Sequence, residues 1–445
     1  MVYGTAHKTL GLLLALTLLF TAFSALPSAA AEQPAAEEAL LESGTEVNAR
    51  MKSLAAGTDT GYWTETEDIK AIRMADSLPA GFVPSAANTV SAADSAYPVY
   101  IVFDNADDKG IMYFYTEAGR IVMSPYSQAM FARNAALADI SGIAGWDASR
   151  VQSMNSMFMG DKSLPDALAL RDWDTSGVTD MSYLFSNDIS LVFADVSGWN
   201  TGNVTRMTSM FQVGESWKSN GQLREIVGIE NLDVSNVTDM TCMFYGAGQM
   251  SFYNIGDWNV SKVESMNHMF CDNRSLRSLD LSKWDVSSLR TICCMFDDNV
   301  SLRTIGDVSR WNTVNLIDAG AWMNNMPSFI GDDTGTLDLS GWDTRNLKSA
   351  TEMFCYTRIH TIDMTGWTFD AVTNDPWEGT GTGYYYETGN NAGYKGLDIM
   401  FKDSSRLTRV FLSQEGLDSF NRAVERGVST EDMWHKCKTS GFTVR

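Results

Sequence analysis

The segment LRSLDLSKW, residues 276–284, decides the fold that this sequence predicts. Leu279 and Leu281 alternate with polar residues, which is the pattern of a short strand whose two leucines face one side. The LxxLxLxx spacing is that of a leucine-rich repeat, with Trp284 where asparagine or cysteine is usual. Because so short a strand cannot form a core by itself, we expect the segment to be one unit of a repeat array.

The tryptophan of this segment recurs along most of the chain with a period of about 26 residues. Leu232 fills the one position of the series that lacks it. A phenylalanine follows twelve residues after most members, and Met323 keeps an apolar side chain there. The series consists of Trp146, Trp173, Trp199, Trp258, Trp284, Trp311, Trp342 and Trp367. Its fixed phase beside leucine and valine assigns the aromatic stripe to core packing, and methionine adapts to gaps between repeats.

The second half of each unit has a different spacing. In residues 261–270, apolar side chains fall three or four apart, which is a helical period, and Ser261 with Glu264 fits a capping box. The sequence therefore predicts an α/β solenoid, a stack resembling a leucine-rich repeat. A parallel β-sheet would form one face and short helices the other, with a β-hairpin capping the N-terminal end.

The ends of the chain differ from the repeats. An apolar run from Leu10 to Ala25 precedes small residues near Ala30, which predicts a secretory signal peptide, and the run is short for the alternative of a membrane anchor. Alternating residues predict two strands in the cap, at 99–103 and 111–115. The expected organisation is a signal peptide at 1–30, a flexible spacer at 31–96, an N-terminal cap at 97–129, a solenoid at 130–412 with insertions at 212–231 and 373–396, and a C-terminal cap at 413–445.

The formal net charge of −22 argues against binding of nucleic acid, because phosphate contacts need clustered lysine and arginine. We expect a secreted, extracellular protein, with or without attachment to the cell surface. Membrane association would need an anchor that the sequence does not reveal, since no cysteine precedes Cys242 and no sorting motif is visible. Six cysteines allow disulfides between neighbouring repeats, with Cys271 to Cys293 or Cys294 the favoured pair, or free buried thiols.

The repeats also carry a family resemblance. LDLSxWD occurs at residues 279–285 and 337–343, VTxMxxMF at 237–244, and the strand pair YIVFDN and YFY at 100–105 and 113–115. In these features the chain resembles the BspA-like leucine-rich-repeat surface proteins of bacteria, over about 97–412. The resemblance implies export and adhesion to host matrix or to other cells, and it names no ligand.

Two polar columns appear when the units are aligned on tryptophan. The first, four residues before it, contains Asp195, Asn254, Asp280, Asp307, Asp338 and Asp363. These side chains alternate with the buried leucines, so we expect them on the exposed face of the sheet, either as a structural ladder hydrogen-bonded to nearby serines or as a binding surface. The second column follows tryptophan directly, and there Asp and Asn are expected to bond the backbone of a turn.

The insertion at 373–396 is a second candidate for binding. It places Trp377, Tyr384, Tyr385 and Tyr386 among glycine, asparagine and threonine, a composition typical of recognition loops. The alternative is a disordered decoration of the repeats.

No HExxH or GxSxG motif and no glycine-rich phosphate loop is present, so we expect no enzyme, no metal site and no cofactor. The leading hypothesis is adhesion or protein–protein recognition, with an extracellular protein or cell-surface ligand as partner. The alternatives are a carbohydrate- or calcium-dependent binding module and, less favoured, a secreted hydrolase.

Overall fold

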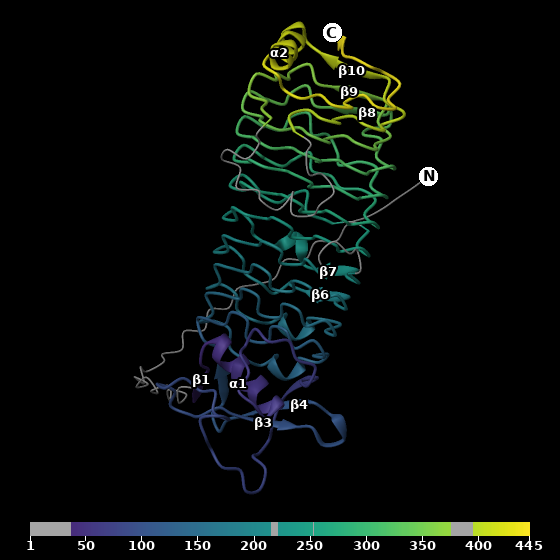
Figure 1. Cartoon of the computed structure of the whole chain (residues 1–445). Helices are drawn as coiled ribbons and strands as arrows, with labels where there is room; N and C mark the ends of the chain where they lie inside the picture. Colours follow the sequence, from purple (N-terminus) through teal and green to yellow (C-terminus); the bar gives the residue numbers. More distant parts are fainter. Residues whose placement is uncertain (1–36, 215–220, 252, 375–394) are drawn as a thin grey trace, which may run out of the picture. The chain divides into compact units, whose positions relative to one another are not determined.

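A computed structural model describes residues 37–214, 221–251, 253–374 and 395–445 of this chain. Most of this part consists of turns and irregular segments, with several short parallel sheets and few helices. The repeats follow one another from the N-terminal strands to the C-terminal helix (Figure 1). The elements are β1 (Glu38–Leu40), α1 (Gly44–Ala56), β2 (Ala71–Met74), β3 (Tyr100–Asp104), β4 (Ile111–Tyr115), β5 (Arg120–Val122), β6 (Phe193–Asp195), β7 (Glu225–Val227), β8 (Thr336–Asp338), β9 (Thr361–Asp363), β10 (Arg409–Leu412), α2 (Gln414–Glu425) and β11 (Thr443–Val444), with 3-10 turns at Ala106–Asp108, Ser141–Ile143, Leu168–Leu170 and Ile229–Asn231.

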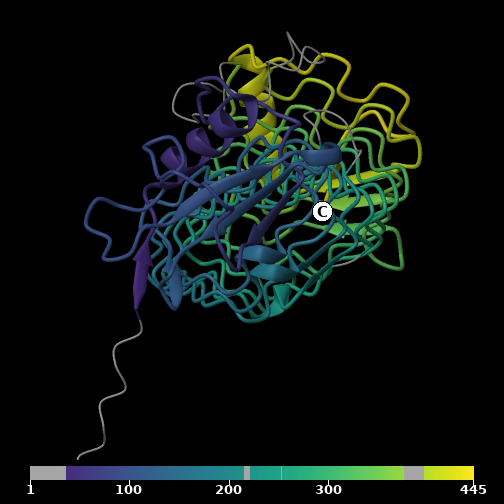
Figure 2. The same cartoon turned by 90° about the horizontal axis from the view of Figure 1, so that it is seen from below.

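The N-terminal elements form part of the folded unit. β3 and β4 pair antiparallel, where the sequence predicts two strands, and β4 also pairs in parallel with β2. β1 pairs in parallel with β5. The expectation of a flexible spacer is therefore wrong for residues 37–96, because Val47 and Met51 of α1 and Ile72 of β2 lie in the common core. Figure 2 shows these elements, in purple and blue, across the near end of the repeats.

Helix α1 also covers the backbone carbonyls at the start of the array. Asn48 Nδ2 donates to the carbonyl oxygens of Ala129 and Ala132 at 2.7 and 3.0 Å. Lys52 is fully buried, and its Nζ donates to Ala132 O and Tyr62 O at 2.7 and 2.6 Å. A buried ammonium group is tolerated where carbonyl oxygens replace its water. α1 thus satisfies acceptors that no earlier repeat could reach.

Backbone hydrogen bonds join each repeat to the next. Ser156, Phe158 and Gly160 donate their N–H groups to the carbonyls of Ser182, Leu184 and Ser186 at 2.8–3.0 Å, and the same pattern continues through later repeats. A line of parallel bridges accompanies it, from Tyr126 through Ser153, Asp180, Arg206, Asp239, Ser265, Thr291 and Asp318 to Ser349.

The expected helices are absent from the repeats in the described part of the chain, where α1 and α2 are the α-helices and both lie outside the repeats. The residue two positions before the phenylalanine has a left-handed backbone in successive units, with φ of 57° at Ser156 and 54° at His268. This conformation interrupts a helix and turns alternate N–H groups toward the neighbouring repeat. The spacing of three or four residues therefore reflects turns rather than a capped helix at Ser261.

The expected parallel sheet is present in pieces. β6 pairs with β7, and β8, β9, β10 and β11 form a second parallel sheet. Between these sheets, Ser278 and Thr304 form an isolated parallel bridge. Successive repeats thus run parallel on this face, but they form regular β-sheet only where the strands are long enough to pair.

Aromatic side chains fill the interior between repeats. The rings of Phe270 and Phe296 stack at 5.6 Å, as do those of the preceding phenylalanines at 5.3–6.1 Å. Each tryptophan of the repeat series from Trp173 to Trp367 also donates its indole N–H to a carbonyl of the previous repeat, at 3.1 Å for Trp284 to Ile255 O. Where Met323 replaces phenylalanine, the ring of Trp322 lies between neighbouring aromatic rings.

A buried polar column runs beside the phenylalanines, three residues after most of them, and is interrupted at Gly214 and Ala247. Asn273 Nδ2 donates to Phe244 O and Phe270 O at 2.7 and 2.8 Å, and Asn299 repeats the arrangement. In the first units the column contains the fully buried carboxylates Asp161 and Asp188, whose Oδ2 atoms have no hydrogen-bond partner. The column contains Asn134, Asp161, Asp188, Asn273, Asn299, Thr357 and Ser404.

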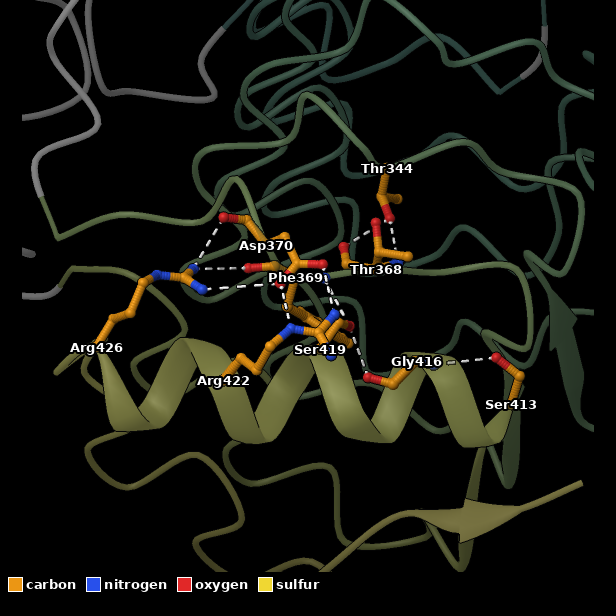
Figure 3. A network of polar contacts seen from close by, with 9 residues as sticks. All are labelled: Thr344, Thr368, Phe369, Asp370, Ser413, Gly416, Ser419, Arg422 and Arg426. Carbon is orange, nitrogen blue, oxygen red and sulfur yellow. Dashed lines mark hydrogen bonds and ion pairs between the residues drawn. The ribbon is translucent and has the colours of Figure 1, made fainter.

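The C-terminal segment adds one more row to the ladder and then covers it. Phe401 N–H donates to Met433 O at 3.1 Å, and the ring of Trp434 stacks on Phe401 at 4.7 Å. Figure 3 shows how α2 docks on the last repeats: Arg422 forms two hydrogen bonds with Asp370, and Ser419 Oγ accepts from Phe369 N.

Candidate functional site

The first aspartate column is anchored to its own turns. Asp280 Oδ1 accepts from the backbone N–H of Ser282 at 3.1 Å and from its hydroxyl at 2.6 Å. Asp195 accepts from Ser197 in the same way, and Asp307, Asp338 and Asp363 each accept the N–H two residues later. These bonds fix the carboxylates at the spacing of the repeats.

The same contacts set the charge of the column. Hydrogen bonds from Ser282 lower the pKa of Asp280, and those from Ser309 lower the pKa of Asp307. At Asp195 burial opposes ionisation, but Ser197 and the nearby Arg171 lower the pKa overall. These three groups are therefore anionic at neutral pH, and each fixed turn presents a negative charge to solvent.

Part of the column lies in a groove of about 780 Å³. Asp307 and Asp338 are brought together there, and Gly306 of the same lining fits closely against Asp280. Gly331, Asp332 and Asp333 of the following loop also line the groove. This loop accounts for the longer interval between Trp311 and Trp342, which was not predicted to be an insertion.

Two arginines in the groove were not predicted as site residues. Arg277 and Arg303 line it from neighbouring repeats, and both are exposed. The signal was available, because each arginine directly follows the first leucine of its unit, Leu276 or Leu302.

The other predicted residues do not join this groove. Asp195 belongs to β6, and Asp363 of β9 forms an ion pair with Arg445 at 2.9 Å. Asn254 is exposed in a unit before the groove. Trp377, Tyr384, Tyr385 and Tyr386 lie outside the residues that the structure describes.

The second column acts within the turns, as its position indicates. Asp147, Asp174 and Asp285 each accept the backbone N–H of the serine two residues later, at 2.9–3.0 Å. Local bonds of this kind stabilise the turn after each tryptophan.

His268 and Cys242 are buried outside the groove. Burial lowers the pKa of His268 to about 4 and raises the pKa of the Cys242 thiol to about 12, so neither is poised for proton transfer or nucleophilic attack at neutral pH. The six cysteines are free thiols, so the favoured bridge from Cys271 is not formed.

Over the described ranges, no group of three or more histidine, cysteine or acidic side chains could hold a metal ion. Within the same ranges, no helix has the length and apolar character needed to cross a membrane.

Comparison with known proteins agrees with the repetition. No curated protein matches the chain. One family matches three times in succession, at residues 127–226, 220–336 and 325–376, which together cover more than half of the chain and include the groove. The chain therefore belongs to the family described as "Mycoplasma protein of unknown function, DUF285".

Proposed function

We propose that this chain is an exported repeat protein that recognises an extracellular protein or a cell-surface ligand through its polar face. In this proposal the repeats form a solenoid of the leucine-rich type, as in the BspA-like surface proteins that the motifs resemble. Secretion is proposed from the apolar segment at 1–30, and adhesion from the resemblance and the character of the face.

One observation carries the proposal: fixed polar side chains line an open groove at the spacing of the repeats. Asp280, Asp307 and Asp338 are anchored by their own turns, so a partner would meet them with little loss of side-chain entropy. The repeated tryptophans that could serve as a carbohydrate platform are instead buried, with Trp284 and Trp311 at most 3% exposed. This distribution favours polar recognition of a partner.

A pull-down with extracellular-matrix proteins and with co-resident cells tests the proposal. Exchanging Asp307→Lys and Asp338→Lys together is expected to abolish capture, because two anchored charges reverse their sign. Deleting residues 373–396 tests the predicted recognition loop separately.

The matched control is Asp172→Lys with Asp418→Lys, which changes the net charge equally at exposed positions outside the groove. Capture that survives both the column exchange and the loop deletion, in variants that keep the wild-type melting temperature, would overturn the assignment. Loss of capture on adding a calcium chelator would favour the calcium-dependent alternative instead.

A further inference from the structure

The two arginines of the groove lie side by side on neighbouring repeats. The backbone N–H of Arg303 donates to Arg277 O at 3.0 Å, and the adjacent Ser278 and Thr304 form a parallel bridge. Neighbouring strands are about 4.8 Å apart, so the two cationic side chains start from almost the same place. Like charges placed next to each other in this way repel and are destabilising.

Neither arginine has a neutralising partner within the described ranges, although the chain carries a net charge of −22. Other arginines on parallel rows do: Arg206 pairs with Asp180 of the previous repeat at 2.7 Å. In the groove, the carboxylates of Asp307 and Asp338 accept hydrogen bonds from their own turns. Arg277 and Arg303 thus form an exposed cationic pair in the same groove as part of the first aspartate column.

The loop at 331–335, part of which lines the groove, is held by its own contacts. Asp332 Oδ1 accepts from the backbone N–H groups of Thr334 and Thr336, both at 2.8 Å, and from the hydroxyl of Thr334 at 2.7 Å. Gly331 has φ of 78°, and a Cβ there would overlap Thr336 O, so the backbone of the loop is tightly placed. The Asp332 carboxylate is therefore committed to the loop.

We propose that Arg277 and Arg303 bind the carboxylate of an acidic side chain in an extended peptide segment of a protein partner. Paired guanidinium groups recognise a carboxylate through parallel N–H donors. The first aspartate column lies three or four residues after these arginines along the strands, about 10 Å from them. It would receive a basic side chain of the same peptide. The groove therefore selects a peptide with opposite charges at this separation and rejects one that is acidic throughout.

This inference rests on the proposed function and names its ligand chemistry. The probe is the capped peptide Ac-Gly-Glu-Ala-Gly-Lys-Gly-NH₂, titrated into the whole protein by calorimetry at low salt. The matched peptide replaces glutamate by glutamine. We expect the glutamate peptide to bind at least about tenfold more tightly, and its affinity to fall as salt is raised.

Two double variants complete the experiment. Arg277→Gln with Arg303→Gln should weaken the glutamate peptide about tenfold or more, while Arg290→Gln with Arg406→Gln, a change of equal charge at exposed arginines outside the groove, should leave it unchanged. Both variants must keep the wild-type circular dichroism spectrum and melting temperature.

Equal affinity for the two peptides, or binding that survives the Arg277 and Arg303 exchanges, would overturn the inference. Displacement of the peptide by equimolar inorganic sulfate would overturn it too, because the site would then recognise small anions. If partner capture is lost on exchanging the Asp column but the peptide never binds, the inference fails and the proposed function stands.

Discussion

Replacing Trp342 by phenylalanine and, separately, Trp322 by phenylalanine tests how buried tryptophan holds the repeats together. Both side chains are at most 1% exposed, and their rings pack against each other at 4.9 Å. Their indole N–H groups differ in hydrogen bonding. Trp342 Nε1 donates to Val308 O of the previous repeat at 2.9 Å, whereas Trp322 Nε1 is buried without a hydrogen-bond partner.

The expected cost differs accordingly. Val308 O also accepts the backbone N–H of Trp311, so Trp342→Phe loses one net hydrogen bond, about 0.5–1.5 kcal/mol, without stranding the carbonyl. Trp322→Phe removes an unpaired buried N–H, which recovers about 1–3 kcal/mol of desolvation. Because both changes remove similar ring volume, packing losses largely cancel in the comparison. We expect Trp342→Phe to be less stable than Trp322→Phe by about 1.5–4.5 kcal/mol.

Urea unfolding followed by tryptophan fluorescence and by far-UV circular dichroism gives the two free energies of unfolding. Coincident transitions are required, since repeat arrays can unfold in stages. Equal stability of the two variants, or a larger loss for Trp322→Phe, would refute the role assigned to the inter-repeat indole bond.

Further expectations concern the buried polar column, the groove and the helix content. Burial raises the pKa of Asp188 above the ordinary carboxyl range, so wild-type stability should fall as pH rises through that folded-state pKa. Asp188→Asn should reduce this dependence, to which the buried Asp161 also contributes, and should gain about 1–3 kcal/mol at pH 7 in urea unfolding. A loss of stability at pH 7 would contradict the reasoning. Gly306→Ala should lower the melting temperature more than Gly427→Ala. Both glycines have positive φ, but only at Gly306 would a Cβ overlap another residue, Asp280. Equal shifts in melting temperature would count against the close packing of Gly306 on Asp280. Far-UV circular dichroism should show little helix, because α1 and α2 contain only 13 and 12 residues; a helix in every repeat would give a signal several times larger.

The sequence predicted what depends on periodic burial. The tryptophan period placed Trp284 and its equivalents in the core, and the alternation around Leu279 and Leu281 matched their burial. The turn role of the column after tryptophan also followed from residue type, as at Asp285. Each of these features repeats in phase, so one unit informs the others.

Features that depend on contacts between repeats were harder to predict. The left-handed position of the turns is occupied by residues as different as Ser156, Tyr183 and His268, and none of these indicates the conformation as glycine would. It is stabilised by the ladder to the next repeat, which a local spacing rule cannot detect. Met433 and Trp434 form the last rung of the backbone ladder and resemble the Met-Phe pair of the repeats. They lie outside the regular period, so the period did not predict them.

The candidate site was predicted only in part. Asp280, Asp307 and Asp338 were identified from the alignment of units, since they stand in one column. The groove is lined in part by Gly331, Asp332 and Asp333, whose backbone path depends on the hydrogen bonds that Asp332 accepts within the loop. The longer interval between Trp311 and Trp342 does not by itself predict how this loop folds.

Footprinting of carboxyl groups on the complex with a captured partner tests the central claim, recognition through the polar face, most directly. Labelling of Asp280, Asp307 and Asp338 should fall on binding, while Asp172, whose side chain is 89% exposed, should label as in the free protein. Unchanged labelling of the three column residues, with protection elsewhere on the chain, would contradict the claim.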